Sequence, residues 1–435
     1  MSEPAEKSPA TGSNMPVDET PAVLLASASW VGADGYEVGG QFHERATSFF
    51  AAVKWDVLVS LSSSFRNGIS CEIGEKFSIG HFNMVRQIVF ADGVRWVARV
   101  RLPKMEAVFG ERELLEDANI LRVEVASMKF LKTKTSIPVP EVHHYDVGPN
   151  NAIGASYILM DYIDGTVATD LQEAKGFRPS QYGTPDQDRK FRQQMAAIQV
   201  ELSCFVFHKI GSLYYDEPTS RFFIGPEVET GKGPWKSPME YYADLADHAL
   251  ESCVASAGAD VLEAPSFGLP ILFKHLISLY GQGTNRSGLS FRLTNRDFGA
   301  HNLLVNDNFE IVGVIDFDGV MAAPAEVVAQ YPQLTGFDPQ PPGHIETRQI
   351  VLDRLKIVMP QIEQYKNLIG TIEATKGSYK TRYPTISSSI SSEAASIYRG
   401  IHSYMSHQKF VNDKWMDAYT RLLLKNVKPR EPSAP

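Results

Sequence analysis

Apolar residues recur at helical spacing early in the chain, between residues 44 and 61. They are Phe49, Phe50, Val53, Val57, Leu58 and Leu61. This spacing predicts one helix. Two runs rich in β-forming residues follow, at 82–90 and 94–100, with Ala91-Asp92-Gly93 between them. An Asp-Gly turn between two such runs predicts a β-hairpin.

A second helical pattern covers residues 111–131, and the prolines at 138 and 140 end it. Its apolar side consists of Leu114, Leu115, Ala118, Leu121, Val125, Met128 and Leu131. Residues 156–163 predict one more apolar strand. Beyond Gly165 the pattern is mostly helical, at 191–208, 238–255, 269–280 and after about 347, and a β-hairpin is predicted within it at 302–316.

The change from a β-rich half to a helical half predicts an α+β, bilobal fold with a cleft between the lobes. We expect a β-rich N-lobe with a leading helix over residues 21–160, and a mostly helical C-lobe over 161–428. Residues 1–20 are rich in Ser, Pro, Glu and Thr and predict a disordered tail. Residues 429–435 are expected to form a second flexible tail.

Composition narrows the possible functions. The 435 residues carry 42 basic and 51 acidic side chains, a net charge of −9, which argues against a nucleic-acid binder. The three cysteines are far apart and suggest neither a disulfide framework nor a metal site. No apolar run is long enough to span a bilayer, and the first residues lack the features of a signal peptide. We therefore expect a cytoplasmic protein, without membrane partners; no pattern indicates an oligomeric state.

Residues 293–318 carry the candidate chemistry. Asp297 is followed five residues later by Asn302, and after a short hairpin Asp316 ends an apolar strand. Phosphoryl transfer needs a carboxylate that holds the attacking hydroxyl and accepts its proton, and an amide and a second carboxylate that hold Mg²⁺. Because a hairpin brings residues of both strands to one end, Asn302 and Asp316 can converge on one metal ion. Asp318 could bind a second metal, contact substrate or cap a turn.

This segment resembles the catalytic and metal-binding segment of the aminoglycoside phosphotransferase family, which has the protein-kinase-like fold. The spacing of Asp297 and Asn302 equals that of the kinase catalytic loop. The resemblance covers residues from about 70 to 335. It implies an ATP-dependent enzyme in which Asp297 is the catalytic base and Asn302 and Asp316 bind Mg²⁺.

The resemblance extends to the β-rich half. Arg99 lies where the family has its phosphate-binding Lys, although Arg101 shares its strand face. Glu124 matches the acid that orients that cation, with Glu113 and Glu116 as alternatives on the same helix. The cofactor-binding residues that the resemblance implies are Gly80 and Asn83 in the nucleotide loop, Arg99 and Glu124, and Met160 and Tyr162 at the hinge facing the adenine.

Three positions depart from the family pattern. Asn295 stands where the family has His, and Gly299 stands where His or Lys is common. Arg99 replaces a Lys, and arginine and lysine do not bind phosphate in the same way. These departures leave an alternative open, a catalytically degenerate kinase-like protein that binds a nucleotide or a partner. A phosphatase of the haloacid dehalogenase type is a further alternative for residues 314–320, but it leaves Asp297 and Asn302 unexplained.

The few residues between Asp316 and Ala323 indicate the class of substrate. Ala323-Pro324-Ala325-Glu326 follows Asp316 almost at once, which leaves no room for the peptide-docking segment of protein kinases. We therefore expect a small-molecule hydroxyl acceptor. Its pocket is predicted in the helical half, near residues 214–223 and the C-terminal helices, where Trp235, Tyr241 and Tyr242 either line it or pack in the core. Acidic groups there would suit a cationic acceptor.

Overall fold

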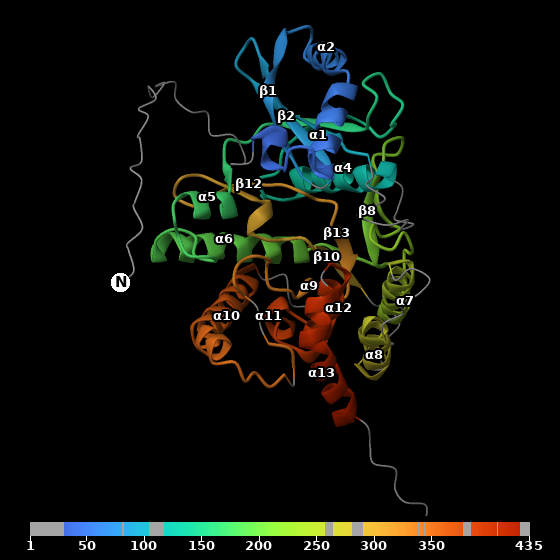
Figure 1. Ribbon diagram of the computed structural model, residues 1–435, viewed down its shortest axis with the longest axis vertical. Helices are drawn as coiled ribbons and strands as arrows, with labels where there is room; N and C mark the ends of the chain where they lie inside the picture. The colour runs from blue at the N-terminus through green and yellow to red at the C-terminus, as the bar shows by residue number, and fades with distance from the viewer. Residues whose placement is uncertain are drawn as a thin grey trace, which may run out of the picture.

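The computed structural model describes residues 30–80, 82–103, 117–256, 264–280, 290–337, 340–342, 344–376, 384–406 and 408–426. Within them the chain forms two lobes, a sheet-based lobe above a mostly helical one in Figure 1. This arrangement confirms the predicted α+β, bilobal, kinase-like fold. The tails predicted at 1–20 and 429–435 lie outside the described residues.

The N-lobe is built on a five-stranded antiparallel sheet with the strand order β1-β2-β3-β5-β4. Its strands are β1 (Cys71–Ile79), β2 (Asn83–Phe90), β3 (Arg95–Arg101), β4 (Val142–Asp146) and β5 (Tyr157–Asp161). The predicted hairpin is confirmed as β2 and β3, in which Val85 lies opposite Arg99. The helix predicted at 111–131 is α4 (Asp117–Lys134), and residues 111–116 of that prediction lie outside the described residues.

Helices cover both faces of this sheet. Leu58 of α2 (Trp55–Phe65) packs in one cluster with Ile88 and Leu159, whereas Val125 of α4 belongs to the cluster on the other face. The prediction of a single helix at 44–61 is wrong, because η1 (Gly32–Gly35) is followed by two separate helices, α1 (Gln41–Ala52) and α2. At the break, the Lys54 amide donates to the Ile153 carbonyl at 3.1 Å, a tertiary bond that a helix interior cannot make.

The C-lobe contains two sheets, of which sequence patterning predicted only one hairpin. That hairpin is β11 (Leu303–Val305) and β12 (Ile311–Val314), joined by β6 (Thr166–Val167). The second sheet has the order β7-β10-β13-β8-β9 and comprises β7 (Val206–Phe207), β8 (Gly211–Asp216), β9 (Arg221–Gly225), β10 (Phe291–Asn295) and β13 (Val320–Ala323). Every residue of β10 is buried, so the strand lacks the alternation that patterning detects.

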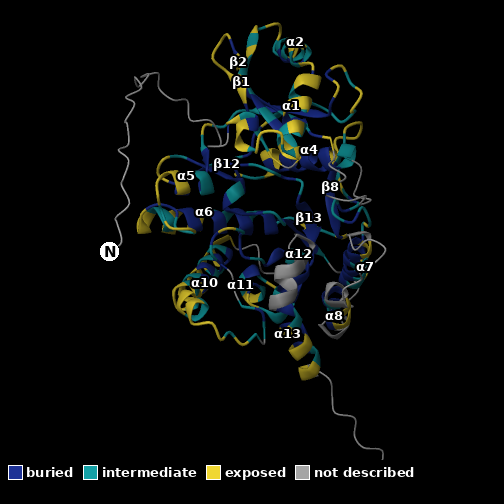
Figure 2. Cartoon of the chain, in the orientation of Figure 1, coloured by how far each residue is buried: buried dark blue, intermediate teal, exposed yellow. Residues whose placement is uncertain are grey.

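The remaining C-lobe elements are helices. They are α5 (Ala168–Ala174), α6 (Pro185–Ser203), α7 (Pro238–Ser256), α8 (Ala264–Tyr280), η3 (Ala300–Asn302), α9 (Ala325–Val328), α10 (Gln349–Lys376), α11 (Ile386–Ser389), α12 (Glu393–Ser406) and α13 (Gln408–Asn426). A capping box of Thr184 and Gln187 begins α6. Trp235, Tyr241 and Tyr242 pack in the core of this lobe, and Figure 2 shows buried residues continuing from it into the N-lobe.

Helix α4 is held by both lobes. On the C-lobe side, its residues Ile120 and Val123 pack against Tyr214 of β8. Lys129 of α4 also forms an ion pair of 2.6 Å with Glu217, which follows β8. The position of α4, and therefore of Glu124, is fixed by contacts from two directions.

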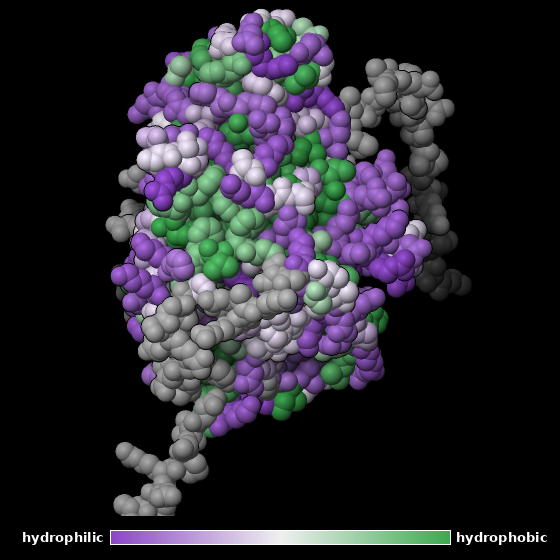
Figure 3. Space-filling model, turned by 180° about the vertical axis from the view of Figure 1, so that it is seen from behind, coloured by the Kyte–Doolittle hydropathy of each residue, from purple (hydrophilic) through white to green (hydrophobic). Residues whose placement is uncertain are grey.

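None of the described helices is long and apolar enough to cross a membrane. Seen from behind, apolar surface gathers midway along the molecule (Figure 3).

Candidate active site

The loop after β10 positions Asp297. Its carboxylate accepts hydrogen bonds from Asn302 Nδ2, at 3.0 Å, and interacts with His301 Nε2 at 3.2 Å. Asn302 Nδ2 also donates to the Asp297 carbonyl at 3.0 Å, which fixes the loop between them. The sequence analysis did not find the contact between His301 and the candidate base.

The electrostatics of Asp297 suit a proton acceptor. Burial opposes its ionisation, but the His301 and Asn302 contacts outweigh burial and hold the pKa of Asp297 below its usual value. The carboxylate is therefore ionised at neutral pH. Its side chain remains 42% exposed, so a hydroxyl group can approach it.

The β11–β12 hairpin brings Asp316 beside Asn302, as predicted. Leu303 lies opposite Val314, and the Ile315 amide donates to the Asn302 carbonyl at 3.0 Å. Asp316 has a φ of +65°, a left-handed conformation that costs energy for a residue with a side chain. Such strain is typical of functional sites.

Asn295 joins the two halves of this site. Its Oδ1 accepts from the Asp297 amide at 3.0 Å, and its Nδ2 donates to the Asp316 carbonyl at 3.1 Å. Gly319 leaves room for this clamp, because a Cβ there would lie 2.7 Å from Asn295 Oδ1. The departure from the family's His therefore leaves an amide that holds both carboxylate-bearing segments.

Arg99 reaches this site from the N-lobe. Its Nη1 donates to Glu124, and its Nη2 lies 3.1 Å from Asp316 Oδ1. The Asn83 amide also belongs here, since its oxygen, when turned toward Arg99, accepts from Arg99 Nε at 3.0 Å and Nη2 at 2.7 Å. Arg101 turns away to Asp117, at 3.1 Å, so Arg99 and not Arg101 lies beside Asp316.

The predicted residues of the adenine side lie apart from this cluster. Gly80 closes the β1–β2 turn, where its amide donates to the Asn83 carbonyl at 2.9 Å. Met160 is buried in β5 opposite Val97. Tyr162 follows β5, and the Arg95 guanidinium lies 4.5 Å from its ring centre. Their contact with a nucleotide stays a prediction.

The site carries an excess of negative charge. The carboxylates of Asp316, Glu124 and Asp297 all act on Asp318, with Arg99 as the opposing cation. Burial and the carboxylates of Asp316 and Glu124 raise the pKa of Asp318 to about 7. Such a group of acids favours binding of a divalent cation.

Two side-chain oxygens at this site are available as ligands for Mg²⁺. In the part of the chain that the structure describes, Asn302 Oδ1 and Asp316 Oδ2 accept no hydrogen bond. Among the same residues, no three His, Cys, Asp or Glu side chains converge as a metal site. The donor set fits Mg²⁺ that takes one or two protein ligands and completes its shell with phosphates and water.

A second ion cluster lies behind Asp297 and was missed by sequence reasoning. Arg296 donates through Nη2 to Glu227 and through Nη1 to Glu229, the latter at 2.5 Å. Burial opposes the charge of Arg296, but both carboxylates outweigh burial and raise its pKa. The position of Arg296 directly before the candidate base is a signal that the sequence offers, and nothing in the sequence points to residues 227 and 229.

Comparison with known proteins agrees with this geometry. Residues 89–327, more than half of the chain, match the phosphotransferase enzyme family APH. The chain belongs to this family. The match includes Arg99, Glu124, Asp297, Asn302 and Asp316.

Relatives within the family have varied names. A subtelomeric hrmA-associated cluster protein of Aspergillus fumigatus is 30% identical over 360 residues, which cover 69% of this chain and 67% of that protein. The altered inheritance of mitochondria protein 9 of Debaryomyces hansenii is 24% identical over 208 residues, covering 42% of this chain. The match spans 32% of that relative, so the chain corresponds to about a third of its length.

Among solved structures, a macrolide 2'-phosphotransferase type I is similar with a TM-score of 0.42 and 12% identity, covering 84% of this chain and 96% of that chain. The choline kinase LicA of Streptococcus pneumoniae has a TM-score of 0.39 and 12% identity, covering 85% of this chain and 98% of its own.

Proposed function

We propose that this phosphotransferase-family protein transfers the γ-phosphate of ATP to a hydroxyl group of a small molecule. One observation carries the proposal: Arg99 of the N-lobe contacts Asp316 of the C-lobe, beside the Asp297–Asn302 pair. The groups that we propose to bind phosphate, bind the metal and accept the proton therefore lie together. Phosphoryl transfer depends mainly on such positioning and on charge stabilisation.

The chain's own groups have distinct tasks in this reaction. Asp297 orients the acceptor hydroxyl and takes its proton. The acceptor oxygen bonds to the γ-phosphorus while the bond from that phosphorus to the β,γ-bridging oxygen breaks, and ADP leaves. Arg99 stabilises the phosphates, and Asn302 and Asp316 would hold Mg²⁺, which neutralises phosphate charge when bound.

A small acceptor is supported by the segment after Asp316. Strand β13 begins at Val320, and α9 follows directly at Ala325. The chain therefore enters buried structure within a few residues of the candidate metal ligand. This leaves no segment on which a peptide substrate would dock.

A non-catalytic nucleotide-binding protein is the second candidate. The observation that favours it is the crowding of Arg99, which Asn83, Glu124 and Asp316 contact together. If these contacts persist with nucleotide bound, the arginine cannot follow the phosphates. Binding without turnover would result.

Two measurements separate the candidates. Calorimetric titration with ATP and Mg²⁺ should give binding, which Asp316→Ala should weaken by about tenfold or more, since a metal ligand is lost. Equal affinity in both proteins would remove Asp316 from the metal site. An ADP-release screen of hydroxyl compounds then tests turnover.

Asp297→Asn is the decisive variant in that screen. It should retain ATP binding and lower turnover by about 10²–10⁴-fold, the usual contribution of a general base. Asn308→Ala is the control variant. Asn308 is exposed in the turn of the β11–β12 hairpin, so its replacement should leave the site intact and keep full activity. Wild-type protein that binds ATP but turns over no acceptor would favour the second candidate.

A further inference from the structure

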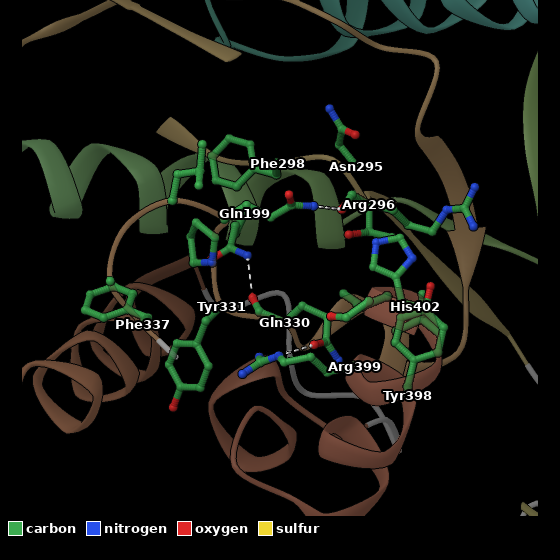
Figure 4. A pocket seen from close by; sticks show the side chains of 18 of the residues that line it. Gln199, Asn295, Arg296, Phe298, Gln330, Tyr331, Phe337, Tyr398, Arg399 and His402 are labelled. Atoms are coloured by element: carbon green, nitrogen blue, oxygen red, sulfur yellow. Dashed lines mark hydrogen bonds between the residues drawn. The ribbon is translucent and has the colours of Figure 1, made fainter. Parts of the chain in front are cut away.

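A cavity of about 520 Å³ lies beneath the loop that carries Asp297. Figure 4 shows Asn295, Arg296 and Phe298 above it and Tyr398, Arg399 and His402 of α12 below it. Its volume is in the range of small-molecule binding sites. The hairpin at 214–223, which sequence reasoning placed near the acceptor, does not line it.

The charged side chains around this cavity have one sign. Among the described residues that line it, Arg296, Arg354 and Arg399 are charged, and none is Asp or Glu. The charge of Arg296 is balanced by Glu227 and Glu229, outside the lining. Arg354, on the exposed side of α10, makes no ion pair with any described residue. This contrasts with the acidic pocket that a cationic acceptor would need and with the chain's net charge of −9.

The walls of the cavity are aromatic and rigid. Tyr331 and Phe337 lie with ring centres 5.8 Å apart, and Figure 4 shows both on the same side of the cavity. The Arg399 guanidinium is fixed over Tyr331, at 5.2 Å, and by a 3.0 Å bond from its Nε to Gln330. Gln330 is held in turn, since its carbonyl accepts from Gln199 at 2.9 Å. Flat apolar walls with fixed polar groups suit a planar ligand.

The cavity is linked to the candidate base. Asn295 ends β10, and Arg296 and Phe298 are the two chain neighbours of Asp297, so the residues on both sides of the candidate base line the cavity. A molecule held beneath this loop therefore lies close to the place where a hydroxyl would be phosphorylated.

From these observations we infer that the cavity binds a small organic anion, a carboxylate or phosphate ester with a flat apolar part, whose negative group meets Arg354 at the mouth. The inference rests on the proposed function in one respect: in a phosphotransferase this anion is the hydroxyl-bearing acceptor. Binding of the anion itself requires no turnover and can be measured alone.

The first test compares two fluorescent probes with the same rings. 8-Anilinonaphthalene-1-sulfonate carries one negative charge, and N-phenyl-1-naphthylamine carries none. The full-length wild-type protein should bind the anionic probe at least about fivefold more tightly. Arg354→Gln should weaken anionic binding about five- to tenfold, as expected for one lost charge-assisted contact, and should change neutral binding less than about twofold.

Two further variants control this test. Arg221→Gln removes another exposed arginine, on β9 and away from the cavity, and should change neither probe. Ser403→Trp places an indole in the cavity from α12 and should weaken both probes, provided that its thermal unfolding matches wild type. Equal affinity of wild type for the two probes, or an Arg354→Gln variant that binds the anionic probe like wild type, would overturn the inference.

The second test uses a matched pair of acceptors, 4-(hydroxymethyl)benzoate and 4-(hydroxymethyl)benzylamine, with ADP release as the readout. The carboxylate should be phosphorylated faster, and it alone should displace the anionic probe. Faster reaction of the amine would overturn the inference while confirming phosphotransfer. Failure of Mg²⁺-dependent ATP binding would instead count against the proposed function, whatever the probes show.

Discussion

Two arginines in this chain each contact two carboxylates, and the surroundings of the two clusters differ. Arg99 joins Glu124 of the N-lobe to Asp316 of the C-lobe, and the Asp316 side chain is 35% exposed. Arg296 contacts Glu227 and Glu229 within the C-lobe, where the arginine is 6% exposed and Glu227 is fully buried.

This difference in exposure suits the Arg99 cluster to binding a ligand and the Arg296 cluster to positioning the loop. Asp316 faces solvent on one side, so it can exchange part of its contact with Arg99 for a metal ion. Glu227 has no such freedom, because it also accepts from the amides of Glu229 and Thr230 and from the Thr230 hydroxyl. A buried carboxylate with all its acceptor sites used can only hold the loop in place.

The largest expected loss of stability therefore comes from changes to the buried cluster of Arg296, Glu227 and Glu229. Glu227→Gln should lower the free energy of unfolding by about 3–5 kcal/mol, because it leaves a buried arginine without one partner. Glu124→Gln should cost less, about 1–2 kcal/mol, since Arg99 keeps its contact with Asp316. Urea unfolding followed by tryptophan fluorescence measures both. Equal losses would show that the two clusters do not differ as described.

Replacing each arginine by lysine should also distinguish the two clusters. Arg296→Lys should cost about 2–3 kcal/mol, because a lysine cannot donate to two separate glutamates through a planar fork. Arg99→Lys should cost less than about 1.5 kcal/mol and should retain binding of ATP with Mg²⁺. A larger loss for Arg99→Lys would mean that its contacts in the cleft are structural.

Loss of the two Asn295 hydrogen bonds, to the Asp297 amide and the Asp316 carbonyl, should lower stability by an intermediate amount. Asn295→Ala removes two buried hydrogen bonds and should lower unfolding free energy by about 1–3 kcal/mol. Because these bonds hold Asp297 and Asp316 in register, turnover should fall further than ATP affinity. Steady-state kinetics and calorimetry test this, with Asn308→Ala as the exposed control. Parallel losses in both would contradict a positioning role.

The effect expected for Asp318 depends on pH and is almost zero at low pH. The raised pKa of Asp318, about 7, means that the folded protein holds a proton that the unfolded chain releases near its ordinary pKa of 3.8. The charged form destabilises the fold as pH rises from about 4 to 7, and the penalty is complete above that range. Asp318→Asn should therefore stabilise the metal-free protein at pH 8 and change its free energy of unfolding by almost nothing at pH 4.

Thermal unfolding in EDTA at the two pH values measures this difference. Using the difference between variant and wild type removes the contribution of other titrating groups, such as His402. A constant difference at both pH values would show that Asp318 does not titrate in this range.

Local patterns predicted a good part of the fold. The β2–β3 hairpin forms because alternating residues flank an Asp-Gly turn, and α6 and α7 form because apolar residues recur at helical spacing. The spacing of Asp297, Asn302 and Asp316 also placed three polar groups at one end of a hairpin, and the structure brings them together.

The errors have a common cause in tertiary contacts. The break between α1 and α2 depends on a carbonyl about 100 residues away, that of Ile153. Strand β10 was missed because it is buried on both faces and therefore shows no alternation. Its neighbour β13 is only four residues long.

The sequence by itself determined which chemical groups are present and the local spacing that lets Asp297 and Asn302 meet. Only the tertiary structure decided that Arg99 rather than Arg101 faces the cleft, and that Glu227 and Glu229 hold Arg296. The physical reason is that residues within a turn of one another are restrained by short-range geometry. Ion pairs between residues about 70 or 200 positions apart exist only after packing has fixed both partners.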